Sequence, residues 1–421
     1  MAYKLDTAAT IFPAVTRKTN TSIYRVSAVL FYEVVPEVLK RAANAVMVRF
    51  PMLKVAYKYD AFDDYFEPND KPIVVKQETE YPCDLIEPEK NNDYYFQILY
   101  YKNRISVEIF HAITDGVGAI EFLKSLLYQY LRMLGEHVTP DGLILLPEDK
   151  IDEQELNDGF EEYYRALKTK MPKLKEAFRI KGTSFEPYGH NVIHGIVDVS
   201  ALKALCKKMK VTITEYLSAA LIYSIYLKCV RDGIDTEPIV ISVPANLRGL
   251  FPTKTIRNFF CIVNISVKPV QNMKFEDILA EVAKQIREKT TKEKLELAMA
   301  ESLNVTHNPI VKKAPRFLRN AGTKFVFAYF GENIKTMSLS NVGAIQMPKS
   351  VNAHIDRIET IIYPTERSPV NCCVCSLENK MTITFIRSII ETDIIKFFFG
   401  YLTSQTGVDV ELYSNDWGMQ L

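Results

Sequence analysis

The sequence lacks the features of a membrane-spanning, secreted or nucleic-acid-binding protein. Its longest apolar run, around residues 217–230, is interrupted by Ser218, Ser224 and Lys228, so we expect no transmembrane segment. The N-terminus has no hydrophobic signal region. The 52 Lys and Arg residues balance the 51 Asp and Glu residues, and no nucleic-acid-binding or phosphate-loop motif occurs. These absences predict a cytoplasmic protein without a nucleic-acid partner.

Cysteine is scarce and follows no framework. Seven cysteines, an odd number in a chain without a signal region, indicate reduced thiols instead of a disulfide scaffold. Cys372, Cys373 and Cys375 contain a C-x-x-C spacing, but no second pair accompanies it. We interpret these three as small core residues of a hairpin strand, and we expect no metal site.

The distribution of apolar residues predicts an α/β protein with two units. A hydrophobic fraction of 48% and a charged fraction of 24% are typical of a globular chain. The length favours roughly two to three domains. We expect the first unit at residues 1–165 and the second at 191–421. Residues 166–190 are the predicted linker, between an acidic stretch near 148–158 and a series of glycine and proline breaks.

Periodicity places individual elements within these units. A helix is predicted to start at Pro36, and alternation predicts strands at 53–59, 73–76, 94–101 and 105–110. The second unit should contain strands at 191–199, 238–243 and 259–267. Its predicted helices are 201–208, with Ser200 as the N-cap, 215–227 and 275–288.

The segment His111-Ala-Ile-Thr-Asp115-Gly116 holds the most chemical information. Residues 104–110 alternate as in a strand, and the apolar residues after Gly116 follow helical spacing. His111 is therefore predicted where a strand ends and a turn leads into a helix. A histidine there is a candidate general base, because a rigid element fixes its backbone while its ring can meet a substrate.

Two other interpretations of this segment compete with a general base. His111 and Asp115 could be metal ligands on one helical face, but Gly116 and Gly118 disfavour a helix there, and no third ligand is near. Taken singly, His111 could be an ordinary strand-end histidine, Asp115 a helix N-cap and Gly116 a turn glycine. The combination in a strand–turn–helix context is more specific than any one of them.

The six residues form an HxxxDG motif, and the segment resembles the chloramphenicol acetyltransferase, peptide-synthetase condensation and plant acyltransferase families. It is closest to bacterial alcohol O-acetyltransferase-like members. The resemblance implies two pseudo-symmetric α/β sandwich lobes around a central tunnel, with His111 at its middle. The motif has one histidine, where many condensation domains carry two, and the Asp-Phe-Gly-Trp-Gly segment of the plant branch is absent.

In the resembled families the motif aspartate forms a salt bridge with an arginine. The segment Val243-Pro-Ala-Asn246-Leu-Arg248 resembles a stretch after a core strand of the second lobe, so Arg248 is our candidate partner for Asp115. Arg25 is a rival, because some branches use an N-terminal arginine. An exposed Arg248 remains an equal alternative. A buried aspartate needs such a partner, and bidentate geometry would fix the turn that carries His111.

A second segment, residues 338–343, resembles the Ser-Asn-x-Gly stretch found late in the second lobe of these families. The resemblance implies that Ser340 and Asn341 orient substrate or stabilise an oxyanion. Gly116 would keep space open beside the histidine. A polar turn closed by Gly343 is the alternative. The basic stretch 307–324 could meet coenzyme A phosphates or an acidic carrier protein, or could be a solvated helix face.

The sequence thus predicts an acyltransferase. It would move an acyl group, most simply acetyl, from acyl-coenzyme A as co-substrate to an acceptor hydroxyl or amine, with both substrates bound together and no permanent cofactor. The sequence contains no G-x-S-x-G nucleophile motif, so we expect no acyl-enzyme. Two alternatives stay open: a free-standing condensation enzyme with a carrier-protein-bound donor, and a non-catalytic binding protein of the same superfamily. Acceptor, acyl length and oligomeric state are not defined by the sequence.

Overall fold

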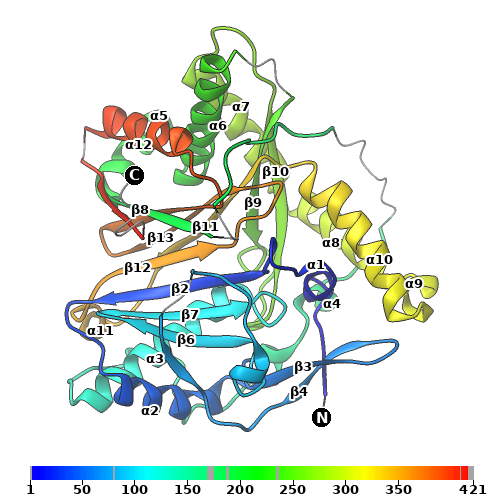
Figure 1. Ribbon diagram of the computed structural model, residues 1–421, viewed down its shortest axis with the longest axis vertical. Helices are drawn as coiled ribbons and strands as arrows, with labels where there is room; N and C mark the ends of the chain where they lie inside the picture. Colours follow the sequence, from blue (N-terminus) through cyan, green and yellow to red (C-terminus); the bar gives the residue numbers. More distant parts are fainter. Residues whose placement is uncertain are drawn as a thin grey trace.

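The computed structural model describes residues 2–78, 81–167, 175–185, 189–233, 237–407 and 409–415. Two lobes lie against each other in Figure 1, the blue and cyan one below and the green to red one above. Each lobe has its own cluster of buried apolar side chains. The mixed α/β architecture with two lobes confirms the predicted fold class.

The first lobe is built on a five-stranded sheet of the order β12-β2-β7-β6-β5. Its strands are β2 (Ile23–Leu30), β5 (Val75–Gln77), β6 (Phe96–Tyr101), β7 (Arg104–Phe110) and β12 (Ile355–Ile362). Helices α2 (Pro36–Val46) and α3 (Gly116–Leu134) pack on each other below this sheet (Figure 1). A small sheet of β1 (Tyr3–Lys4), β4 (Asp64–Pro68) and β3 (Val55–Tyr59) stands beside it.

The second lobe contains a sheet of the order β10-β9-β11-β13-β14-β8-β15. Its strands are β8 (Asn191–Asp198), β9 (Ile239–Asn246), β10 (Phe260–Val267), β11 (Met337–Ile345), β13 (Val370–Leu377), β14 (Lys380–Arg387) and β15 (Glu411–Ser414). Helices α5 (Val199–Met209), α6 (Ile213–Arg231), α7 (Phe275–Lys289) and α12 (Asp393–Thr406) pack together above it (Figure 1).

The remaining elements are short or lie at the side of the molecule. Helices α8 (Lys292–Thr306), α9 (Pro309–Lys313) and α10 (Arg316–Val326) project at the right of Figure 1, and a π-turn at Phe327–Glu332 follows them. Short helices are α1 (Phe12–Val15), α4 (Gly159–Glu162) and α11 (Lys349–Asn352). Single 3-10 turns occupy Ala9–Ile11, Met47–Arg49, Pro88–Lys90 and Glu153–Leu156.

Two elements lie in the lobe opposite to the one that their place in the sequence predicts. Strand β12 comes from the second part of the sequence but pairs antiparallel with β2 of the first lobe. In the other direction, Phe160 precedes the predicted linker but is buried in the second lobe's core. These two elements tie the lobes together in space. The expected division into 1–165, 166–190 and 191–421 stays a prediction, and residues 168–174 and 186–188 of the expected linker lie outside the described residues.

Helix α6 is long and apolar enough, by length and composition alone, to cross a membrane. We expected Ser218 and Ser224 to interrupt this run, but both are buried within one continuous helix. Ser224 donates its hydroxyl to the carbonyl of Ala220, which satisfies the group inside the helix. Because 67% of the apolar window is buried among the second lobe's elements, α6 has the surroundings of a core helix.

Several local expectations need correction. Helix α3 begins at Gly116 and includes Gly118, although both glycines were expected to disfavour a helix. Helix α5 is capped by Asp198, whose carboxylate accepts from Ala201 N, while Ser200 lies inside the helix. Strands β1, β2, β4, β11, β12 and β15 were not predicted. The alternation expected of a half-exposed strand is absent from β2, because all of its residues are buried. All seven cysteines are buried free thiols.

Candidate functional site

His111 directly follows the last residue of β7 and lies where the two lobes meet. Its backbone N–H donates to Ser22 O at 2.9 Å, which continues the pairing of β7 with β2. The ring stacks on Phe12, with centroids 4.6 Å apart, and lies 4.8 Å from the ring of Tyr24. Phe260 of the second lobe approaches to 5.6 Å. Aromatic rings therefore fix the imidazole from both lobes.

One nitrogen of the His111 ring is held and the other is left open. Nδ1 lies 3.1 Å from Oδ1 of Asn258, and Nδ2 of Asn258 donates to Asp6 at 3.1 Å. Since an amide oxygen only accepts, Nδ1 must carry the proton. Within the described residues Nε2 makes no hydrogen bond. It is not one of the buried polar atoms that lack a partner, and His111 is partly exposed, so Nε2 can be reached by solvent. Nε2 is therefore an accessible, unprotonated nitrogen.

Burial lowers the pKa of His111 below its usual value of 6.5. Its own backbone carbonyl, the carboxylate of Asp115 and the amide of Asn258 oppose this shift and do not reverse it. The imidazole is therefore neutral at neutral pH, which is the state that a general base requires.

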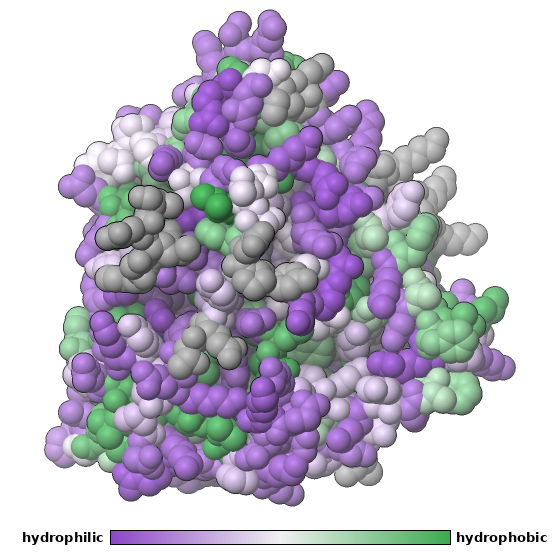
Figure 2. Space-filling model, in the orientation of Figure 1, coloured by the Kyte–Doolittle hydropathy of each residue, from purple (hydrophilic) through white to green (hydrophobic). Residues whose placement is uncertain are grey.

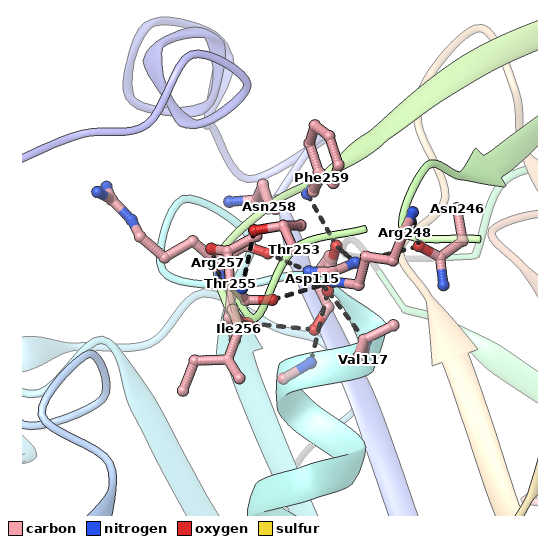
Figure 3. A network of polar contacts seen from close by, with 12 residues as sticks. Asp115, Val117, Asn246, Arg248, Thr253, Thr255, Ile256, Arg257, Asn258 and Phe259 are labelled. Atoms are coloured by element: carbon pink, nitrogen blue, oxygen red, sulfur yellow. Dashed lines mark hydrogen bonds and ion pairs between the residues drawn. The ribbon is translucent and has the colours of Figure 1, made fainter. Parts of the chain in front are cut away.

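Asp115 caps helix α3 and also pairs with an arginine. Its carboxylate accepts from Val117 N at 3.0 Å and from Gly118 N at 3.4 Å, in the extended conformation typical of an N-cap. Arg248 donates to it through Nη1 at 2.8 Å and Nη2 at 3.3 Å, and Phe259 N donates at 3.0 Å. Figure 3 shows the carboxylate at the centre of this network. It holds the turn of the first lobe against a loop of the second.

Arg248 also binds the loop on which it stands. Nε donates to Thr255 O at 3.0 Å, and Nη2 donates to Arg257 O at 2.6 Å (Figure 3). Arg25, the rival candidate, instead pairs with Glu78 at 2.6 Å and Glu108 at 2.7 Å. Of the two predicted partners of Asp115, the structure therefore has Arg248, and that side chain is mostly buried.

The motif glycine and its neighbour differ in what surrounds them. A Cβ on Gly116 would meet only Val342, at an ordinary 3.9 Å. A Cβ on Gly118 would come within 2.1 Å of the Thr114 hydroxyl and 2.3 Å of Ile256 O. Thr114 donates its hydroxyl to that same carbonyl. Gly118 is therefore the residue that permits the close approach of the two lobes, and the sequence had marked only Gly116 for a special role.

We expect Gly118→Ala to destabilise the protein by about 3 kcal/mol or more, because a backbone carbonyl must move to make room. Gly116→Ala is the matched control in the same helical turn and should change the free energy of unfolding by about 1 kcal/mol at most. Chemical denaturation of both variants measures the difference. Equal stabilities would show that the lobes do not meet as closely as described.

Ser340 and Asn341 lie on β11, next to the point where its register with β13 shifts. The Asn341 amide donates to the Thr214 hydroxyl at 2.9 Å and accepts from Gly343 N at 2.9 Å. Both residues are partly exposed, and no hydrogen bond joins them to His111 in the described part of the chain. Their role as donors to an oxyanion stays a prediction. The hydrogen bond between Asn341 and Gly343 is also what the alternative, a polar turn closed by Gly343, would require.

The basic stretch 307–324 directly follows α8 and contains α9 and most of α10. Arg316 pairs with Asp64 at 2.7 Å and Arg319 with Asp63 at 3.3 Å, so these two bind the β3–β4 hairpin. Within the described ranges, no cluster of three His, Cys, Asp or Glu side chains has the arrangement of a metal site.

Sequence reasoning missed the residues that contact His111 from elsewhere, which are Phe12, Tyr24, Asn258 and Phe260. It also missed Asp6, which accepts a hydrogen bond from Asn258. Of these, only Asn258 and Phe260 could have been found from the sequence, because they follow Arg257 in the segment after Arg248. Tyr24 also donates its hydroxyl to the carbonyls of the HxxxDG turn, at 2.9 and 3.0 Å. These contacts are set by tertiary packing, which periodicity does not contain.

Asp6 anchors the N-terminal segment beneath Asn258. It is fully buried, pairs with Arg257 at 3.5 Å and accepts from Ala9 N at 2.8 Å. Burial raises its pKa to about 6, against the opposing effect of Arg257. The carboxyl is therefore harder to ionise in the folded protein than in the unfolded chain.

This raised pKa predicts how stability depends on pH. Between the unfolded value of 3.8 and about 6, the folded state holds a proton that the unfolded chain has lost, so stability falls as pH rises. Asp6→Asn should remove this slope, which is worth about 2–3 kcal/mol in all. Unfolding measured from pH 4 to pH 7 tests this. Identical slopes in variant and wild type would contradict the assignment.

Several solved structures share this fold along almost the whole chain. A structure of F. graminearum TRI101 complexed with coenzyme A and deoxynivalenol has a TM-score of 0.63 at 12% identity, over 98% of this chain and 99% of the other. Polyketide synthase associated protein 5 from Mycobacterium tuberculosis has a TM-score of 0.59 at 13% identity, over 96% and 98%. The condensation domain of the Monacolin K polyketide synthase MokA has a TM-score of 0.58 at 9% identity, over 96% of each chain.

The chain thus shares its two-lobed fold with condensation domains and acetyltransferases among the solved structures. No protein-family model and no curated protein matches its sequence. At 9–13% identity the likeness defines the fold and leaves the substrates open.

Proposed function

We propose that the protein is an acyltransferase that moves an acyl group, most simply acetyl, from a coenzyme A thioester to an acceptor hydroxyl or amine. The observation that carries the proposal is the state of His111: Nδ1 is held by Asn258, Nε2 is open, and burial keeps the ring neutral. The fold shared with TRI101, whose structure contains coenzyme A, supports the choice of donor.

The proposed reaction is a direct transfer in a ternary complex. Nε2 of His111 takes the proton of the acceptor O–H or N–H as that atom attacks the thioester carbonyl carbon. When the tetrahedral intermediate collapses, the C–S bond breaks and the imidazolium returns the proton to the leaving thiolate. The Asn258 carbonyl, which accepts from Nδ1, stabilises the imidazolium between these steps. Ser340 and Asn341 are the proposed donors to the oxyanion.

Incubation with a panel of acyl-coenzyme A thioesters and candidate alcohols and amines tests the proposal. We expect release of free thiol that depends on the acceptor, with stoichiometric formation of the acylated product. Product formation through a covalent acyl-enzyme, detected as a stable mass increase of the protein, would contradict the direct transfer. Thiol release with no acceptor dependence would indicate a hydrolase instead.

Asn258 is proposed as a positioning residue for the base. Asn258→Ala should lower kcat about tenfold to a hundredfold, because the imidazole can then exchange its tautomer and rotate between the aromatic rings that surround it. The Asn258 hydrogen bond raises the pKa of His111, so its loss should move the acidic limb of the pH–rate profile to still lower pH. A lower rate with an unmoved limb would show a merely structural role.

A condensation enzyme with a carrier-protein-bound donor is the second candidate, favoured by the shared fold of the MokA condensation domain. Turnover measured with acyl-coenzyme A alone, and then with the same acyl group on a carrier protein, separates the two. We expect turnover with the free thioester. A strict requirement for the carrier protein would favour the condensation enzyme, and binding without turnover of either donor would favour a non-catalytic member.

A further inference from the structure

Helix α10 places its arginines toward the protein and its apolar side chains toward solvent, which is the reverse of an ordinary surface helix. Its arginines, Arg316 and Arg319, face inward and pair with Asp64 and Asp63 of the β3–β4 hairpin. No residue of α9 or α10 is buried. A surface helix normally places its apolar side on the core and its charges in water, so the apolar side of α10 has no partner among the described residues.

The exposed side chains form one surface, which we call the α9–α10 surface. Phe317, Ala321, Phe325 and Tyr329 follow each other at four-residue intervals and are exposed, to 70%, 61% and 57% for the three aromatic residues. Figure 2 shows hydrophobic surface at the right-hand edge, over α9 and α10. The members of this surface are Ile310, Phe317, Leu318, Phe325, Val326 and Tyr329, with Tyr59 and Phe62 of the adjoining hairpin.

The same segment is strongly biased in charge. Residues 302–331 contain five Lys and Arg residues and no Asp or Glu. Lys312, Lys313 and Lys324 are exposed, and none forms an ion pair in the described part of the chain. After Arg316 and Arg319 have paired with the hairpin, three free cations therefore remain beside the apolar side chains.

We propose that the α9–α10 surface docks peripherally on an anionic phospholipid bilayer. Exposed Phe, Leu and Ile on one helical side with lysines beside them are the composition of helices that lie in the membrane interface. The lysines complement the negative lipid headgroups. An acidic carrier protein would also attract the lysines, but its charged surface would not bury the exposed aromatic side chains.

The position of this surface relates it to the site. Helix α10 contacts α1, and Phe12 of α1 stacks on the ring of His111. A docked bilayer would therefore lie on the side of the molecule from which Phe12 approaches the base. The docking itself does not depend on what reaction His111 performs.

Cosedimentation of the full chain with vesicles tests the proposal. We expect binding to vesicles of phosphatidylcholine mixed with phosphatidylserine, weaker binding to phosphatidylcholine alone, and loss of binding as salt increases. Lys312→Gln combined with Lys313→Gln and Lys324→Gln should weaken binding to the anionic vesicles roughly a hundredfold. On neutral vesicles the same variant should match the wild type.

The apolar contribution has its own variant and control. Phe317→Ser with Phe325→Ser should weaken binding to anionic vesicles at least about tenfold, because two aromatic side chains no longer insert. Phe31→Ser is the matched control, because Phe31 is 63% exposed on another part of the molecule and should leave binding unchanged. All variants change exposed side chains, so their melting curves should overlay that of the wild type.

Three results would overturn the proposal. The first is a wild-type protein that stays in solution with anionic vesicles. The second is binding to vesicles that the Phe317→Ser, Phe325→Ser variant retains in full. The third is a dimer in solution that this variant dissociates, because a second copy of the chain would then cover the surface.

Discussion

Replacing His111 by alanine should lower the rate of acyl transfer by roughly a hundred- to ten-thousandfold, the range of a general base. The ring is partly exposed, and its only side-chain hydrogen bond among the described residues is the one to Asn258. We therefore expect the fold to survive, with a small loss of packing against Phe12. Initial rates of product formation at saturating thioester and acceptor measure the effect.

A second histidine supplies the control. His307 is partly exposed, contacts Glu161 at 2.7 Å and is the C-cap of α8. His307→Gln should leave the rate unchanged. If His111→Ala retained the wild-type rate, or if both variants lost the same amount, the assignment of His111 as the base would fail.

Replacing Arg248 by alanine should destabilise folding by about 3–5 kcal/mol, since it leaves the mostly buried Asp115 without its charge partner. The carbonyls of Thr255 and Arg257 lose a donor in the same step. Three backbone N–H groups still donate to Asp115, which places the expected cost toward the lower end of that range. Denaturant unfolding followed by circular dichroism measures it.

The effect on chemistry should be smaller than the effect on stability, because Arg248 contacts the turn and not the imidazole. Arg231→Ala is the matched control: it removes ion pairs of a half-exposed side chain with Asp232 and Asp393, and such exposed pairs are worth ~0–1 kcal/mol each. Combining Arg248→Ala with Asp115→Ala should cost less than the sum of the two single variants, as expected of a coupled pair. An unchanged unfolding curve for Arg248→Ala would contradict a structural salt bridge.

The sequence predicted the fold class and the local context of the motif because both depend on short-range pattern. Alternation up to Phe110 and helical spacing after Gly116 placed His111 correctly at the end of a strand. The pairing of Asp115 with Arg248 needed a resemblance, since 133 residues separate the two. Composition alone could not have chosen between Arg248 and Arg25.

The remainder of the site depends on how the lobes close on each other. Asp6 and Asn258 are 252 residues apart, and no periodicity relates them. Gly118 appeared as a helix-disfavouring residue, while its function follows from the position of a carbonyl in the other lobe. The orientation of α10 was equally hidden, because an amphipathic pattern does not state which side faces the protein.

The state of the His111 imidazole is what the account depends on, and nitrogen NMR of histidine-labelled protein measures it without any knowledge of the substrates. His111→Gln identifies the resonance. We expect the Nδ1–H tautomer at neutral pH, with protonation only below pH 6.5. A resonance from the Nε2–H tautomer, or a ring that is already protonated at pH 7, would contradict a base held ready at Nε2.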